Sequence, residues 1–288
     1  MTSKEQDRRQ FLHLAGAGVA ASLVGARNGS AQNGRPSARR RGIKPLFQLG
    51  LASYTLRQFD LDETLAMTVK VGLKYICFKS MHLELDSTPD QIKATVAKVN
   101  EAGLTLYGGG VIGMKNEDQI NQAFDYAKTA GMTVIIAAPS HPMLPLIEKK
   151  VKQYDIKVAI HNHGPGDKYF PTPAVALEHI KNLDKRIGMC HDIGHTKRYG
   201  SDPIAETELC ADRLHDVHIK DVSEATRAGK GVEIGRGVID IPRFIRTLVK
   251  VKYDGIVSFE YEKDAKDPMA GLAESVGYVK GIIAALRG

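Results

Sequence analysis

The sequence predicts an α/β fold, a closed (β/α)8 barrel that occupies residues 45–288 as a single domain. Short apolar segments alternate with amphipathic segments eight times in about 240 residues, which is the pattern of a parallel barrel. A doubly wound open sheet is the alternative. It would favour a glycine-rich phosphate loop after the first strand, and Leu51-Ala52-Ser53-Tyr54-Thr55 is not such a loop.

The elements follow from apolar runs of strand length and from helical periodicity. The expected strands span 47–53, 74–79, 105–110, 133–138, 157–163, 187–192, 214–220 and 255–260. The expected helices span 61–71, 88–102, 117–130, 143–154, 173–183, 203–212, 241–251 and 270–286. Helix N-caps are predicted at Asp60, Ser87, Asn116 and Asp240.

A local repeat supports this register. A helix end, a glycine and a new strand follow one another at Gly72, Gly103 and Gly131, where glycine suits the left-handed residue after a helix. The glycine triplet at 108–110 follows the third strand without an acidic partner at the spacing of a dinucleotide site, so we expect a flexible loop at the barrel rim.

The N-terminus has the pattern of an export signal. Arg8-Arg9 precedes a short apolar run with small residues near Ala26 and Ala31, which predicts a twin-arginine-like signal peptide over residues 1–31. A basic amphipathic start is the alternative. Residues 32–44 are rich in Arg, Gly, Ser and Pro and predict a disordered linker. We therefore expect a periplasmic or otherwise exported protein with no membrane span after signal removal.

The excess of positive charge lies entirely in this N-terminal segment. Residues 1–44 hold nine Lys or Arg and two acidic residues, which accounts for the whole formal charge of +7. The neutral remainder argues against a nucleic-acid partner. Cys77, Cys190 and Cys210 are an odd set without a close pair, which argues against a disulfide framework and favours small core residues for Cys77 and Cys190.

Four successive strands end in side chains that can bind a metal. Alternation along a strand puts each of three groups on one face: His161 with His163, Asp216 with His218 and Lys220, and Ser258 with Glu260 and Glu262. Asp192 ends the sixth strand, and His195 follows past its turn. The carboxyl ends of barrel strands meet at one rim. Imidazoles and carboxylates gathered there favour one divalent ion of Mn²⁺, Zn²⁺, Co²⁺ or Fe²⁺.

Other side chains are expected near this rim. Lys79 ends the second strand and His82 follows shortly after it, and we expect both to contact substrate together with His195 and Lys220. An exposed loop lysine is the alternative for Lys79. The basic segment 197–199 after His195 reads as a solvated loop rather than a phosphate clamp.

These motifs resemble the xylose isomerase-like TIM barrels known as sugar phosphate isomerases/epimerases. The resemblance rests on Cys190-His191-Asp192-Ile193-Gly194-His195, Val217-His218-Ile219-Lys220-Asp221, Gly235-Arg236-Gly237-Val238-Ile239-Asp240 and Ser258-Phe259-Glu260. It implies a metal held by His161, Asp192, His218 and Glu260. Relatives carry Glu at the position of His161, so the symmetric epimerisation by two glutamate bases does not transfer directly.

The expected activity is proton abstraction beside a carbonyl of a small-molecule carbohydrate, with Glu260 as the favoured base and His163 or Lys220 moving the second proton. Isomerisation, epimerisation and β-elimination of a keto-sugar or 3-keto-glycoside all use such a step. A non-catalytic exported carbohydrate-binding barrel and an abasic-site endonuclease are alternatives from other classes, and the neutral domain argues against the endonuclease. The sequence leaves homo-oligomerisation open.

Overall fold

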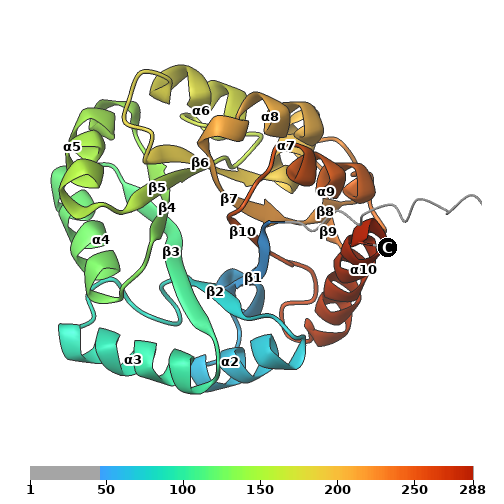
Figure 1. Cartoon of the computed structure of the whole chain (residues 1–288), viewed down its shortest axis with the longest axis horizontal. Helices are drawn as coiled ribbons and strands as arrows, with labels where there is room; N and C mark the ends of the chain where they lie inside the picture. Colours follow the sequence, from blue (N-terminus) through green and yellow to red (C-terminus); the bar gives the residue numbers. More distant parts are fainter. Residues whose placement is uncertain (1–45, 288) are drawn as a thin grey trace, which may run out of the picture. The chain divides into compact units, whose positions relative to one another are not determined.

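The computed structural model describes residues 46–287, and the expected signal peptide and linker lie outside the described residues. Within this range eight parallel strands close into a barrel, as the sequence predicts (Figure 1). Around the barrel, β1 and β10 are neighbours and close the sheet. The barrel strands are β1 (Gln48–Ala52), β2 (Tyr75–Phe78), β3 (Thr105–Met114), β4 (Val134–Pro139), β5 (Lys157–His161), β6 (Ile187–Asp192), β7 (Leu214–Ile219) and β10 (Ile256–Phe259).

The helices surround the strands as an outer ring (Figure 1). They are α2 (Leu61–Lys70), α3 (Pro89–Glu101), α4 (Glu117–Thr129), α5 (Leu144–Tyr154), α6 (Pro173–Ile180), α7 (Ile193–Tyr199), α8 (Pro203–Leu209), α9 (Ile241–Lys250) and α10 (Met269–Arg287). By length and composition α10 could cross a membrane. In the barrel its Leu272, Val276 and Val279 are buried in the hydrophobic core, as befits an outer barrel helix.

The helix caps follow the sequence closely. Asp60, Asn116 and Asp240 each accept a hydrogen bond from a first-turn N–H of the helix that follows. The predicted cap at Ser87 is wrong by one residue. Thr88 caps α3 instead, because its side chain and that of Gln91 form a reciprocal capping box ahead of Pro89.

Gly72, Gly103 and Gly131 have φ between 68° and 74°, the left-handed conformation expected after a helix end. The prediction of a rim loop at residues 108–110 is wrong, however. These glycines lie inside β3, which pairs with β4 on both sides of a register shift between Gly109 and Ile112. An added Cβ at Gly110 would lie 2.3 Å from the carbonyl oxygen of Ile136, so the close approach of β4 requires glycine there.

Two further segments differ from expectation. The basic segment 197–199 is not a loop but the last turn of α7, which begins directly after β6. After β7 the chain forms a small antiparallel hairpin, β8 (Asp221–Val222) with β9 (Gly231–Val232), which the sequence pattern did not predict. Both segments lie at the carboxyl ends of β6 and β7, next to the predicted ligands.

Candidate metal centre

The four side chains implied as ligands converge at the carboxyl ends of four neighbouring strands. His161 ends β5, Asp192 ends β6, His218 lies near the end of β7, and Glu260 follows β10 directly. One nitrogen or oxygen from each residue lies within 4.8 Å of those of the other three, and all four side chains are buried. Strands neighbouring in the sheet present their last inward-facing residues at one rim, which produces this cluster.

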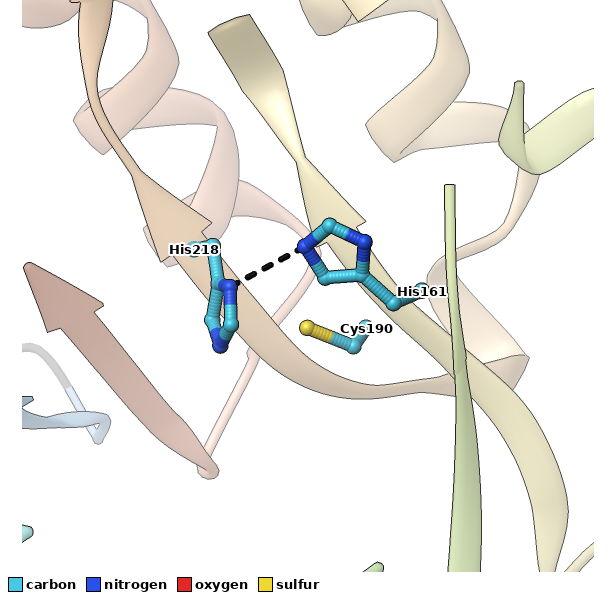
Figure 2. Close-up of side chains that lie close together, drawn as sticks. All are labelled: His161, Cys190 and His218. Atoms are coloured by element: carbon cyan, nitrogen blue, oxygen red, sulfur yellow. Dashed lines mark hydrogen bonds between the residues drawn. The ribbon is translucent and has the colours of Figure 1, made fainter. Parts of the chain in front are cut away.

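The two imidazoles lie at the centre of the cluster. His161 Nε2 lies 3.1 Å from His218 Nδ1 (Figure 2) and 3.4 Å from Asp192 Oδ2. His218 Nδ1 also lies 3.2 Å from Glu260 Oε2. Burial lowers the pKa of His161 to about 3, so this imidazole is neutral near pH 7 and carries a lone pair.

Lys220 introduces a positive charge into the same cluster. Its Nζ lies 2.9 Å from Asp192 Oδ2 and 2.7 Å from Glu260 Oε2, and it also contacts Glu262. Burial disfavours the ammonium, but the three carboxylates outweigh this and raise the pKa of Lys220 well above its usual value. In turn Lys220 helps to hold the pKa values of Asp192 and Glu260 well below their usual range despite burial.

These residues fit a divalent metal ion in charge and in donor chemistry. Three carboxylates, those of Asp192, Glu260 and Glu262, face one ammonium, which leaves two negative charges that a divalent cation would balance. Asp192 Oδ2 is buried, and its ion pair with Lys220 at 2.9 Å lies outside hydrogen-bond geometry, so this oxygen accepts no hydrogen bond among the described residues. Two imidazole nitrogens with two carboxylates suit Mn²⁺, Zn²⁺, Co²⁺ or Fe²⁺ better than Ca²⁺, which takes six to eight oxygens.

His195 is also brought to the cluster. Asp192 caps α7 by accepting a hydrogen bond from the backbone N–H of His195 at 2.7 Å, which ties the end of β6 to the start of the helix. The His195 ring centroid lies 5.8 Å from that of His161, and the ring lines a narrow pocket together with Lys220 and Glu262. His195 therefore faces the same space as the candidate ligands.

His163 lies on the open side of the cluster. Its ring centroid is 4.5 Å from that of His161, and both side chains line an open pocket of about 770 Å³. His163 Nδ1 lies 3.3 Å from Asp167 Oδ2, and the backbone N–H groups of Tyr169 and Phe170 donate to the other oxygen of Asp167. Burial raises the pKa of Asp167, but these contacts outweigh it and hold that pKa well below its usual value, so the carboxylate stays ionised.

The two residues expected after β2 behave differently. The Lys79 ammonium donates to the carbonyl oxygen of Val111, and burial lowers its pKa. The ring of His82 is buried, and its two nitrogens lie 2.9 Å from Ser53 Oγ and 3.0 Å from Thr64 Oγ1. The contact of His82 with substrate stays a prediction.

A second polar layer lies inside the barrel, two residues before the ligands on β6, β7 and β10. Its members are Cys190, Asp216 and Ser258, joined by Tyr107 of β3. Cys190 lies beside the two histidines (Figure 2). Burial and the neighbouring Asp216 raise the pKa of the Cys190 thiol, which keeps it protonated. Cys190 thus matches the predicted role of a small core residue.

Sequence reasoning missed some residues of the site. Asp167 lies in a loop, and its only signal was the four-residue spacing from His163. Asn162 accepts a hydrogen bond from the backbone N–H of Asp192 and donates to its carbonyl oxygen. Its place between two histidines in the strand-five motif was the available signal. Asn162 fixes the end of β6 relative to β5, and hence the position of Asp192.

Comparison with known proteins identifies the family. A family model described as xylose isomerase-like TIM barrel matches residues 60–282. The chain belongs to this family. The match covers every barrel strand except β1 and includes the four candidate ligands.

Two curated relatives match parts of the chain. SgbU of Escherichia coli strain K12, named as an L-ribulose-5-phosphate 3-epimerase, is 29% identical over 94 residues, which is 31% of this chain and 33% of SgbU. The rhizopine catabolism protein MocC of Rhizobium meliloti is 26% identical over 137 residues, 41% of this chain and 40% of MocC. The matched segments therefore span less than half of either relative.

Solved structures agree in fold over most of the chain. A structure of L-ribulose 3-epimerase superposes with a TM-score of 0.68 at 17% identity and covers 84% of this chain and 96% of that one. AsbF from Bacillus anthracis, named as a 3-DHS dehydratase, gives a TM-score of 0.65 at 13% identity over 81% of this chain and 99% of that one. At these identities the likeness shows the fold alone.

Proposed function

We propose that the protein is a metal-dependent enzyme that removes a proton next to a carbonyl group of a carbohydrate. The observation that carries this proposal is the convergence of His161, Asp192, His218 and Glu260 within 4.8 Å, beside an open pocket into which His163 projects. A pocket of about 770 Å³ has room for a sugar. A sugar epimerase shares this fold, and SgbU, which matches part of the chain, is named as an epimerase of a sugar phosphate, which is consistent with this substrate class.

His161, Asp192, His218 and Glu260 would hold the metal ion. When bound, such an ion polarises a carbonyl oxygen and stabilises the negative charge that develops after proton removal. The fixed positive charge of Lys220, held between Asp192 and Glu260, adds to this favourable potential. Lys220 also supplies a proton donor at the cluster.

The contacts favour His163 over Glu260 as the base. Glu260 is bound by Lys220 and approached by His218 at 3.2 Å, so its basicity is low and a ligand role suits it better. His163 is partly exposed to the pocket, and Asp167 orients its ring through Nδ1. In its neutral form this ring holds a proton on Nδ1 and leaves Nε2 as the proton acceptor.

Isomerisation or β-elimination fits these groups better than symmetric epimerisation. Epimerisation by two opposed bases needs a second base, and the strand-five position holds the buried imidazole of His161, whose lowered pKa of about 3 makes it a ligand rather than a base. A metal-dependent lyase acting on a keto-sugar or 3-keto-glycoside is therefore the second candidate. Export to the periplasm, as Arg8-Arg9 suggests, would direct either enzyme to free sugars or oxidised glycosides.

Solvent-exchange measurements test this proposal. The purified chain, loaded with Mn²⁺ or Zn²⁺, is incubated in deuterium oxide with a panel of keto-sugars and 3-keto-glycosides, and deuterium in the sugar is read by NMR. We expect incorporation that stops when EDTA is added. Sugar binding without any incorporation across the panel would support the non-catalytic barrel instead.

A further inference from the structure

Two layers of polar side chains are stacked inside one side of the barrel. The upper layer holds the candidate ligands Asp192, His218 and Glu260 at the ends of β6, β7 and β10. The lower layer holds the residues two positions earlier on the same strands, namely Cys190, Asp216 and Ser258. Since side chains two residues apart share a strand face, the lower layer lies directly beneath the ligands. The proposed function leaves this layer without a role.

Asp216 supplies the carboxyl group of the lower layer. Its side chain has no solvent exposure, and among residues 46–287 no Lys or Arg forms an ion pair with it. Tyr107 Oη donates toward both carboxylate oxygens at 3.3 Å, and Cys190 Sγ lies 3.7 Å from Oδ2. A buried carboxyl group without a cation is costly to a fold. Its presence inside the barrel, with no Lys or Arg paired to it, therefore calls for a functional reason.

His218 connects the two layers through its two ring nitrogens. Its Nδ1 faces the ligand cluster, 3.1 Å from His161 Nε2 and 3.2 Å from Glu260 Oε2. Its Nε2 faces the lower layer, 3.7 Å from Asp216 Oδ2, and has no hydrogen-bond partner within the described part of the chain. The two nitrogens thus face different environments, and a carboxylate oxygen of Asp216 lies near Nε2 on the lower side.

We propose that Asp216 is a positioning residue that accepts the Nε2–H of His218 and so keeps the Nδ1 lone pair directed at the metal ion. This inference rests on the proposed function, because it takes His218 as a metal ligand. An imidazole ligand commonly gives its second N–H to a carboxylate, which selects the tautomer and increases the donor strength of the ligating nitrogen. Tyr107 Oη also donates toward this carboxylate, at 3.3 Å.

Zn²⁺ affinity of the full chain tests the proposal, measured by competition with a chelator. Asp216→Asn keeps the shape of the side chain but removes its charge, and its amide group can donate to Nε2 and stabilise the wrong tautomer. We expect this variant to bind Zn²⁺ about 10- to 100-fold more weakly than wild type. Tyr107→Phe is the matched control, because it removes a hydrogen bond from the same carboxylate but leaves the contact with His218, and its affinity should stay close to that of wild type.

A second readout needs no substitution in the lower layer. In ¹⁵N-histidine-labelled wild-type protein with Zn²⁺ bound, the NMR signals of His218, identified with a His218→Gln variant, should show the proton on Nε2. A proton on Nδ1, or Asp216→Asn with wild-type affinity, would overturn the inference. If wild type binds Zn²⁺ and His218→Gln does not, that result leaves the proposed metal site intact. Failure of wild type to bind would instead refute the proposed function itself.

Discussion

His161 Nε2 and His218 Nδ1 face each other at 3.1 Å inside the barrel, and both imidazoles are almost fully buried. Two lone pairs in this arrangement would repel, so the pair is stable only with a shared proton or a shared cation. Burial lowers the pKa of His161 and keeps this ring neutral. For His218 the attraction of the nearby carboxylates, chiefly Glu260 and then Asp216 and Asp192, outweighs the effect of burial and raises the pKa. A metal ion bound between the two rings would take the place of the proton in this contact.

We expect His163→Gln to lose activity while it keeps its metal. The ring of His163 borders the pocket, and the atoms of the ligand cluster lie on other residues. Loss of a general base typically lowers the rate about 10²- to 10⁴-fold. The rate of deuterium incorporation and the metal content of the variant measure the two effects separately.

Glu260→Gln is the matched comparison for that experiment. It keeps an oxygen donor but removes the charge that pairs with Lys220, so we expect weaker metal binding and an activity that added metal partly restores. If His163→Gln turned over normally while metal-saturated Glu260→Gln did not, Glu260 would be the base, as the sequence pattern first suggested.

We expect Asp216 to make the metal-free protein less stable as the pH rises. Burial raises the pKa of Asp216 to about 7. Between the pKa of an unfolded Asp, about 4, and this value, the unfolded chain releases a proton that the folded chain retains, so the free energy of unfolding falls as the pH rises. For a pKa shift of this size, ionisation of Asp216 lowers the free energy of unfolding by at most about 4 kcal/mol at and above pH 7.

Urea unfolding in EDTA between pH 4 and pH 8 measures this effect. The stability of wild type relative to Asp216→Asn should decline across that range and level off above about pH 7. Other carboxyl groups titrate in both proteins and cancel in the difference. A difference that did not vary with pH would show that folding leaves the pKa of Asp216 unchanged.

The sequence predicted the barrel because its strands are short and apolar, and it predicted which side chains share a face because alternation along a strand is local. The prediction of a loop at Gly108, Gly109 and Gly110 was wrong, because glycines have no side chains to show the alternation of a strand. Pairing with β4 forms the strand here. Thr88 could have been recognised as a cap from Gln91 three residues later.

Contacts between side chains of different strands could not be predicted from the sequence. Lys220 was placed on the face of His218, but its contacts with Asp192 and Glu260 depend on the pairing of β6, β7 and β10. The surroundings of His82 could not be predicted either, because nothing local shows that Ser53 and Thr64, on other elements, lie beside its ring. Side chains that meet across the fold are set by tertiary packing, which a single sequence does not reveal.

Arg213 is expected to stabilise the fold away from the metal centre. Its buried guanidinium donates to four backbone carbonyl groups, those of Lys181, Leu183, Asp184 and Ile187, and so fastens the loop before β6 to the start of β7. Arg213→Met leaves these carbonyls unpaired and should lower the free energy of unfolding by about 3 kcal/mol. Arg246, exposed on α9, is the control, and Arg246→Met should change stability by no more than about 0.5 kcal/mol.

Export is expected to depend on the arginine pair at the N-terminus. Arg8-Arg9 precedes an apolar run, as in substrates of the twin-arginine route, which carries folded proteins. Replacing both residues by Lys keeps the charge but removes the pair, so precursor should accumulate in the cytoplasm of the expressing bacterium. Cell fractionation and immunoblotting would show this, with Lys4→Arg as the control. Unchanged export of the double variant would argue against the twin-arginine route.

The metal content of the purified protein tests the central claim most directly. Elemental analysis should find about one divalent transition-metal ion per chain in wild type, because four ligand atoms converge within 4.8 Å. Asp192→Ala and His218→Ala should each lose most of that metal, whereas His82→Ala, which alters a histidine away from the cluster, should retain it. Full occupancy in both ligand variants, or a wild-type protein that takes up no metal, would contradict the account.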